Sequence, residues 1–86
     1  TKSMARNLGP IRVNAICPGF IQGDWLRNGM GDDLYNAALE NLTNNTPLKL
    51  TVTPEQVAEG IYSFIDINTV VTGETMLMDG GHHLIT

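Results

Sequence analysis

The chain has 86 residues, 42% of them apolar, and a formal net charge of −4 with only five lysine and arginine residues. A chain of this length supports one small core, and its scattered cations form no basic stripe that could neutralise a nucleic-acid backbone. We find no apolar run long enough to span a bilayer and no signal-peptide core, so we expect no membrane partner and a cytoplasmic location.

The first eight residues predict the end of a helix. Met4, Ala5 and Leu8 share one face, and the pair Gly9-Pro10 is a typical stop signal. No capping residue with room before it precedes this helix. We therefore expect the chain to be a piece of a longer protein.

The stretch Ile11–Ile21 predicts the central strand, because its alternate residues point to opposite faces of an extended chain. Pro18 has no N–H to give to a ladder, so regular pairing should end there. Gly19 then permits either a turn or the close approach of a ligand to the main chain. Asn14 is expected to form hydrogen bonds that fix the strand end.

The segment 22–31 predicts a loop, because three glycines interrupt any clean period. It fits either a mobile flap over a pocket or a surface loop in which Trp25 and Leu26 pack on the domain. The lone Cys17 before it suits a small packed side chain, or alternatively a weakly reactive thiol.

A helix is predicted after this segment, with Asp32 or Asp33 as its cap and residues 44–46 as its end before Pro47. Its apolar face consists of Leu34, Tyr35, Ala38, Leu39 and Leu42. Such a stripe is typical of a core. The alternative is a substrate-facing role for Tyr35 or Leu39.

The next helix has the clearest local signal in the chain. Thr53 can cap it, Pro54 suits its first position, and Gln56 completes a capping box. The face predicted to lie on a sheet consists of Val57, Ala58, Ile61, Tyr62 and Ile65. A second strand, Glu74–Met78, follows, and the long helical connection predicts that it runs parallel to the first.

No residues of the chain form a recognisable catalytic cluster. A Gly-rich phosphate loop is absent, and His82 and His83 stand at the end of the chain, where adjacent side chains would point apart. That is poor geometry for one metal ion, so we expect no metal site and a solvated or interface role for the pair.

Four blocks in this order resemble the C-terminal part of the short-chain dehydrogenase/reductase (SDR) family. They are TKSMARNLGP, IRVNAICPGFI, TPEQVAEGIYSFI and TGETMLMDGG. The resemblance implies an α/β fold, namely the C-terminal portion of a doubly wound Rossmann-type parallel sheet in the order helix, strand, lid helix, helix, strand. Residues 1–86 would be part of a single domain whose cofactor loop and catalytic Tyr and Lys lie upstream of Thr1.

The resemblance also implies roles for residues of this chain. Pro18, Gly19 and Ile21 would lie along the nicotinamide of an NAD or NADP cofactor, with a backbone group of Ile21 meeting its carboxamide. A substrate lid would contain Trp25, Leu26, Met30 and Tyr35. Gly23 stands where the family often has a Thr that reaches the cofactor, and Gln22 is its candidate substitute.

The implied function is hydride transfer between the nicotinamide cofactor and a small carbonyl or alcohol substrate, in a homotetramer or dimer formed through the last strand and Asp79-Gly80-Gly81. This would be an NAD(P)-dependent oxidoreductase whose catalytic residues are not in this chain. One alternative is a non-catalytic binding or assembly protein on the same scaffold, of which Gly23 would be a sign. Another is an independent interaction module.

Overall fold

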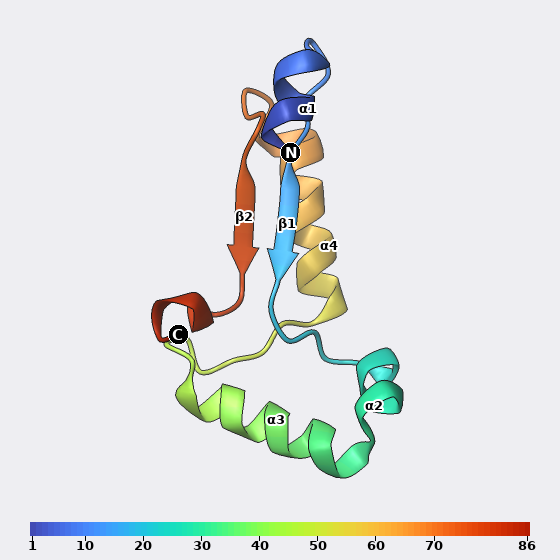
Figure 1. Cartoon of the computed structure of the whole chain (residues 1–86), viewed down its shortest axis with the longest axis vertical. Coiled ribbons are helices and arrows are strands. Elements are labelled where there is room, and N and C mark those ends of the chain that lie inside the picture. The colour runs from blue at the N-terminus through green and yellow to red at the C-terminus, as the bar shows by residue number, and fades with distance from the viewer.

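The computed structural model describes all 86 residues and is organised around two parallel strands. Strand β1 (Ala15–Pro18) pairs with β2 (Thr75–Met78), with Ala15 opposite Thr75 and Pro18 opposite Met78. The two strands lie side by side and point the same way, and the helices between them in sequence form the connection (Figure 1). The α/β class and the parallel pairing are thus as predicted.

Strand β1 is shorter than the predicted stretch, because the residues before it are held by different bonds. The Asn14 side chain donates to the Val71 carbonyl at 2.9 Å and accepts from the Glu74 N–H at 3.0 Å. The Val13 N–H donates to the Thr72 hydroxyl at 3.1 Å. Asn14 therefore fixes the beginning of both strands, which confirms its predicted bonding role.

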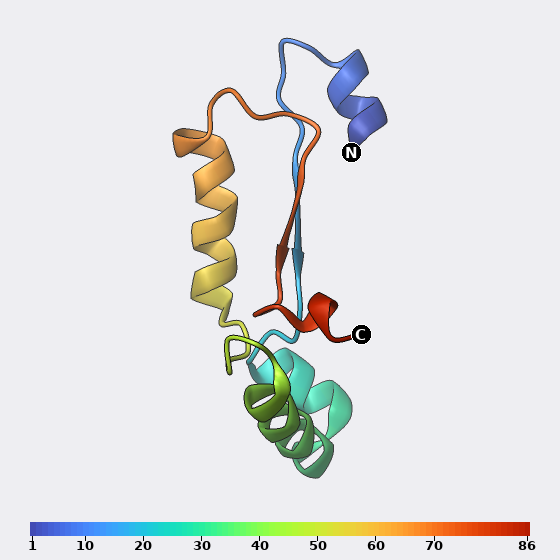
Figure 2. The same cartoon turned by 90° about the vertical axis from the view of Figure 1, so that its left-hand side faces the viewer.

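Helix α4 (Pro54–Tyr62) lies along one face of the strands, as the edge-on view shows (Figure 2). Its capping box is present: the Thr53 hydroxyl accepts from the Gln56 N–H at 3.2 Å, and the Gln56 side chain accepts from the Thr53 N–H at 2.9 Å. A π-helical turn, η1 (Ser63–Ile67), continues the helix.

The contact line between α4 and the sheet differs from the predicted one. It runs through Gly60, which is buried, and an added Cβ there would collide with the sulfur of Met78 and approach Met76. Ile61 and Ile65, expected on the sheet face, line a groove with Asn14 and Ile16 and stay 47% and 65% exposed. The missing side chain of Gly60 lets the sheet approach at that point, so the helix packs through Gly60 and the two isoleucines lie to one side of this contact.

Helix α2 (Asp24–Met30) replaces the predicted loop. The three glycines do not break it: Gly23 precedes its first residue, Gly29 lies inside it, and Gly31, at φ 86°, follows its last residue. Asp24 and Arg27 form an exposed ion pair at 3.7 Å. The Trp25 side chain is 87% exposed, so it does not pack on the domain in this chain.

Helix α3 (Asp32–Asn45) begins and ends close to the predicted positions, but its cap is Gly31 and not an aspartate. Asp32 and Asp33 lie in its first turn, where carboxylates interact favourably with the helix dipole. Gly31 takes the cap position because its positive φ makes the sharp turn between α2 and α3.

The remaining elements are short. Helix α1 (Lys2–Asn7) buries Ala5 beside the beginning of β2, and a 3₁₀ turn, η2 (His82–Leu84), ends the described chain. Only six residues are buried in all, so much apolar surface of the sheet and of α4 faces outward. None of the helices has both the length and the apolar character that crossing a lipid bilayer requires.

Candidate functional site

The candidate site lies at the carboxyl ends of the two strands, where α2 and α3 are attached (Figure 1). Ladder pairing stops at Pro18, as predicted, and the Gly19 N–H donates to the Met78 carbonyl at 3.0 Å. An added Cβ at Gly19 would lie 2.9 Å from Cβ and 3.2 Å from Cα of Asp79. Gly19 therefore permits the close approach of two backbone segments of the same chain.

Beyond Gly19, backbone hydrogen bonds to Val52 fix Phe20 and Gln22. The Phe20 carbonyl accepts from the Val52 N–H at 3.0 Å, and the Gln22 N–H donates to the Val52 carbonyl at 2.8 Å. Ile21 lies between them in an isolated parallel bridge to Val52. Because successive residues of an extended chain direct their polar groups to opposite sides, the N–H and C=O of Ile21 point away from Val52. Neither has a hydrogen-bond partner in the chain.

A cavity of about 330 Å³ adjoins this segment. Its lining combines the turn after β1 with the beginnings of α2 and α4, and consists of Gly19, Ile21, Gln22, Gly23, Asp24, Trp25, Leu26 and Pro54. The structure thus brings together two of the expected nicotinamide-side residues with two of the expected lid residues. Pro18 ends β1 and is not part of this lining.

The other two expected lid residues lie apart from the cavity. Met30 is half-buried at the end of α2. Tyr35 is only 2% exposed, and its hydroxyl accepts a hydrogen bond from the Gly23 N–H at 3.1 Å. The Tyr35 ring also lies 5.4 Å from that of Phe20 and 4.8 Å from the Arg27 guanidinium. Tyr35 thus connects α3 with the segment that lines the cavity.

Gln22 and Gly23 offer few side-chain groups to a ligand. The Gln22 amide donates to the Thr51 hydroxyl at 2.7 Å, so this amide is directed toward Thr51. Gly23, with φ 149°, has its N–H bound by Tyr35. The polar groups available near the cavity are therefore those of the Ile21 backbone and the exposed carboxylate of Asp24, which pairs with Arg27 at 3.7 Å.

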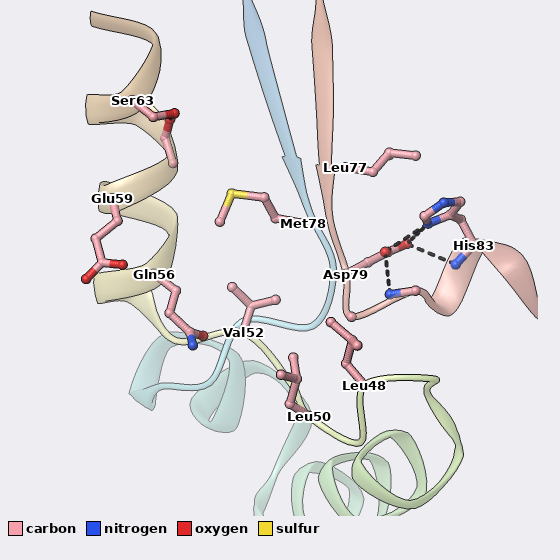
Figure 3. A pocket seen from close by; sticks show the side chains of 13 residues that line it. Leu48, Leu50, Val52, Gln56, Glu59, Ser63, Leu77, Met78, Asp79 and His83 are labelled. Atoms are coloured by element: carbon pink, nitrogen blue, oxygen red, sulfur yellow. Dashed lines mark hydrogen bonds and ion pairs between the residues drawn. The ribbon is translucent and has the colours of Figure 1, made fainter. Parts of the chain in front are cut away.

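A larger groove, of about 480 Å³, lies between α4 and β2, as the close view shows (Figure 3). Asp79 lies at its rim, where its carboxylate accepts from the Gly81 and His83 N–H groups at 3.0 Å and lies 2.9 Å from His83 Nδ1. Partial burial alone would raise the pKa of Asp79, but the hydrogen bonds from His83 and Gly81 and the His83 charge lower it overall. Asp79 is thus a structural anion that holds the turn after β2.

The histidine pair and the cysteine are placed separately. His83 contacts Asp79, whereas His82 lines a cavity of about 290 Å³ and its buried Nδ1 has no hydrogen-bond partner. The Cys17 thiol is exposed on β1. Neither group reaches the lining of the cavity beside Ile21.

Sequence reasoning missed the role of Val52, whose backbone fixes the segment around Ile21. A single residue that bridges two distant segments leaves no periodic pattern, so the sequence gives no signal for this role. Tyr35 was placed on an apolar stripe, but nothing in that stripe identifies Gly23 as the partner of its hydroxyl.

Known proteins match this chain over nearly its whole length. The family model for enoyl-(acyl carrier protein) reductases matches residues 1–83. The second ketoacyl reductase assigned to the granaticin polyketide synthase of Streptomyces violaceoruber is 38% identical over 86 residues, 99% of this chain. The NADH-dependent enoyl-[acyl-carrier-protein] reductase FabI of Bacillus cereus is 37% identical over 87 residues, 98% of this chain. The chain spans about a third of these relatives, 33% of the length of each.

Solved structures agree. A small-chain dehydrogenase in complex with NADPH superposes with a TM-score of 0.86 at 33% identity, and the match covers 98% of this chain and 37% of that one. A short-chain dehydrogenase family protein of Francisella tularensis gives a TM-score of 0.83 at 29% identity, over 98% of this chain and 38% of that one. The two parallel strands, the helices between them and the turn after β1 therefore have the Rossmann-type arrangement of these proteins. From its sequence match and its fold together, the chain belongs to the short-chain dehydrogenase/reductase family.

Proposed function

We propose that the whole protein is an NAD(P)-dependent oxidoreductase that transfers a hydride between nicotinamide and a carbonyl or alcohol substrate. In this proposal the 86 residues supply the nicotinamide side of the cofactor site, part of the substrate lid and a subunit interface. The acid or base of the reaction would be a Tyr upstream of Thr1, with an upstream Lys and Ser as its partners. The cytoplasmic location expected from the sequence stays a prediction.

The observation that carries this proposal is the free backbone of Ile21. Its N–H and C=O are unpaired and lie beside a cavity, while Val52 fixes the residue on either side. A carboxamide has one donor group and one acceptor group, so it matches an adjacent N–H and C=O of one residue. Because both groups are fixed before a ligand arrives, little conformational entropy is lost on binding.

The names of the relatives support the same cofactor class. One relative is an NADH-dependent reductase and one structural neighbour was solved with NADPH. The lining around Ile21 is largely apolar, with Trp25 and Leu26 on α2, which suits a cover that excludes water during hydride transfer. In this proposal α2 supplies this cover.

The test is cofactor binding by the whole protein, with Ile21→Pro compared with Ile21→Val. Proline removes one N–H that forms no hydrogen bond within the chain. The hydrogen bonds that the Phe20 carbonyl and the Gln22 N–H form with Val52 remain available. We expect Ile21→Pro to weaken NADH or NADPH binding roughly tenfold, the size expected for one unmade hydrogen bond in a desolvated site. Ile21→Val should bind like the unmodified protein.

Fluorescence titration with both reduced cofactors measures these affinities, and thermal unfolding shows whether Ile21→Pro is folded. Equal affinity of a folded Ile21→Pro and the unmodified protein would contradict the assigned contact. If the unmodified protein binds neither cofactor, the proposed function itself is wrong.

A non-catalytic binding or assembly protein is the second candidate, and one observation favours it. Gly23 has no hydroxyl, and its N–H is taken by Tyr35, so this position offers a cofactor no donor. Binding of a reduced cofactor without its oxidation by any carbonyl substrate would support this candidate. Oxidation of the cofactor would support the enzyme.

A further inference from the structure

We propose that Tyr35 is a positioning residue that holds the backbone of Ile21 in its ligand-ready conformation. It would also join this backbone to α2 and α3, which carry the expected lid residues and are called the lid helices below. The inference rests on the proposed function, since it assigns Tyr35 to the same nicotinamide-side segment. Tyr35 itself does not line the cavity beside Ile21. It would act through the residues that it contacts.

The contacts of Tyr35 reach both ends of the segment that presents Ile21. On one side its ring packs against Phe20 at 5.4 Å between ring centroids, inclined by 41°. On the other side its hydroxyl accepts the Gly23 N–H at 3.1 Å. Ile21 therefore lies between two residues that one buried side chain holds in place.

The opposite side of the same segment is held by Val52. Phe20 and Gln22 each form one backbone hydrogen bond with it, and Val52 is only 4% exposed. The segment is thus clamped between Val52 and Tyr35. Removal of either contact leaves the Ile21 N–H and C=O free to rotate away from a ligand.

Tyr35 also connects this segment to both lid helices. It belongs to the first turn of α3, and the Arg27 guanidinium of α2 lies 4.8 Å from the centre of its ring. Gly23 is the residue that precedes α2. A movement of α2 or α3 must therefore displace Tyr35 or stretch its bond to Gly23, which couples the lid to the cofactor segment.

The Tyr35 hydroxyl restrains the backbone of Gly23, which has no side chain of its own to do so. A glycine with φ 149° has a wide range of accessible conformations, and no side chain of its own limits them. The bond from its N–H to a buried phenol supplies that restraint from another element. Loss of the bond should lower the fraction of molecules that are ready to bind, which raises the apparent dissociation constant by the same factor.

The experiment compares Tyr35→Phe with Tyr62→Phe in the whole protein. Tyr35→Phe keeps the ring beside Phe20 and Arg27 and removes only the hydroxyl. Tyr62→Phe makes the same chemical change on α4, where the Tyr62 hydroxyl donates to Asp66 at 2.7 Å, far from the cavity. Thermal unfolding of both variants establishes that each is folded.

We expect two effects of Tyr35→Phe that Tyr62→Phe does not share. Without cofactor, amide hydrogen exchange should become faster in the segment 20–24. With cofactor, the dissociation constant and KM for NADH or NADPH should rise about three- to tenfold, the range for one hydrogen bond, whereas kcat at saturation should stay within about twofold. Bound cofactor restores the segment, which is why kcat is spared.

The results for the two variants decide whether Tyr35 has a positioning role. If amide exchange and cofactor affinity of Tyr35→Phe equal those of the unmodified protein, the positioning role is wrong. A fall in kcat at unchanged affinity, or an equal affinity loss in Tyr62→Phe, also overturns it. If the unmodified protein binds no nicotinamide cofactor, the proposed function fails and this inference fails with it.

Discussion

At the scale of single residues, Gly19 shows how one missing side chain shapes the site. Gly19 follows the last residue of β1, and the backbone of Asp79 passes beside it in the turn after β2. Any side chain at Gly19 would push these two segments apart. The same displacement would move Ile21, two residues further along.

We expect Gly19→Ala to destabilise the whole protein by about 1–3 kcal/mol, because a Cβ 2.9 Å from that of Asp79 overpacks the turn. It should also weaken cofactor binding. Gly29→Ala is the matched control: it lies inside α2 with nothing within 4 Å of an added Cβ, and alanine there should stabilise by about 0.5–1 kcal/mol. Chemical denaturation measures both changes, and equal stability of the two variants would refute the close approach.

At the scale of elements, α4 combines a strong local signal with a contact that depends on the sheet. The capping box of Thr53 and Gln56 satisfies the first N–H groups of the helix by local hydrogen bonds alone. The position of the helix on β1 and β2 depends instead on Gly60, which faces Met76 and Met78. The beginning of α4 and its orientation thus have separate causes.

We expect Thr53→Ala to lower the stability of the whole protein by about 1 kcal/mol, because the Gln56 N–H then loses its side-chain acceptor. Thr69→Ala, in an exposed turn after η1, makes the same substitution away from any helix start and should have little effect. Thermal unfolding of both variants distinguishes the two. A similar loss for Thr69→Ala would show that the capping box is not the cause.

At the scale of the whole molecule, the subunit interface proposed at the last strand can be tested on β2. β2 pairs only with β1, and Leu77 on its outer face is 51% exposed. Leu84 and Ile85, just after the turn, are 71% and 53% exposed. An unpaired strand edge beside apolar side chains is a surface that another chain can cover.

We expect Leu77→Lys to shift the whole protein to a smaller assembly, because a charged side chain would have to be desolvated in the interface. Val70→Lys is the control, since Val70 is 96% exposed and lies in the turn before β2 (Thr75–Met78), away from the turn that follows it. Light scattering after size-exclusion chromatography gives the mass of each variant. An unchanged mass for Leu77→Lys would argue against an interface at β2.

Local chemistry was sufficient for the features that the sequence predicted correctly. Thr53 and Gln56 act over three residues, Pro18 ends pairing because it has no N–H, and the parallel order follows from the length of the connection between the strands. The family was also recognisable, because four blocks and their spacing are properties of the sequence alone. The roles of Pro18, Gly19 and Ile21 as cofactor contacts remain predictions.

Tertiary structure decided the remaining features, because they depend on residues far apart in the chain. Gly31 displaced the aspartates as the cap of α3, since the turn from α2 required a positive φ there. Gly60 set the face of α4 through its contact with Met78, and Val52 and Tyr35 fixed the segment around Ile21 from opposite sides. Sequence periodicity reports which residues share one face of an element, but only packing decides which distant residue that face meets.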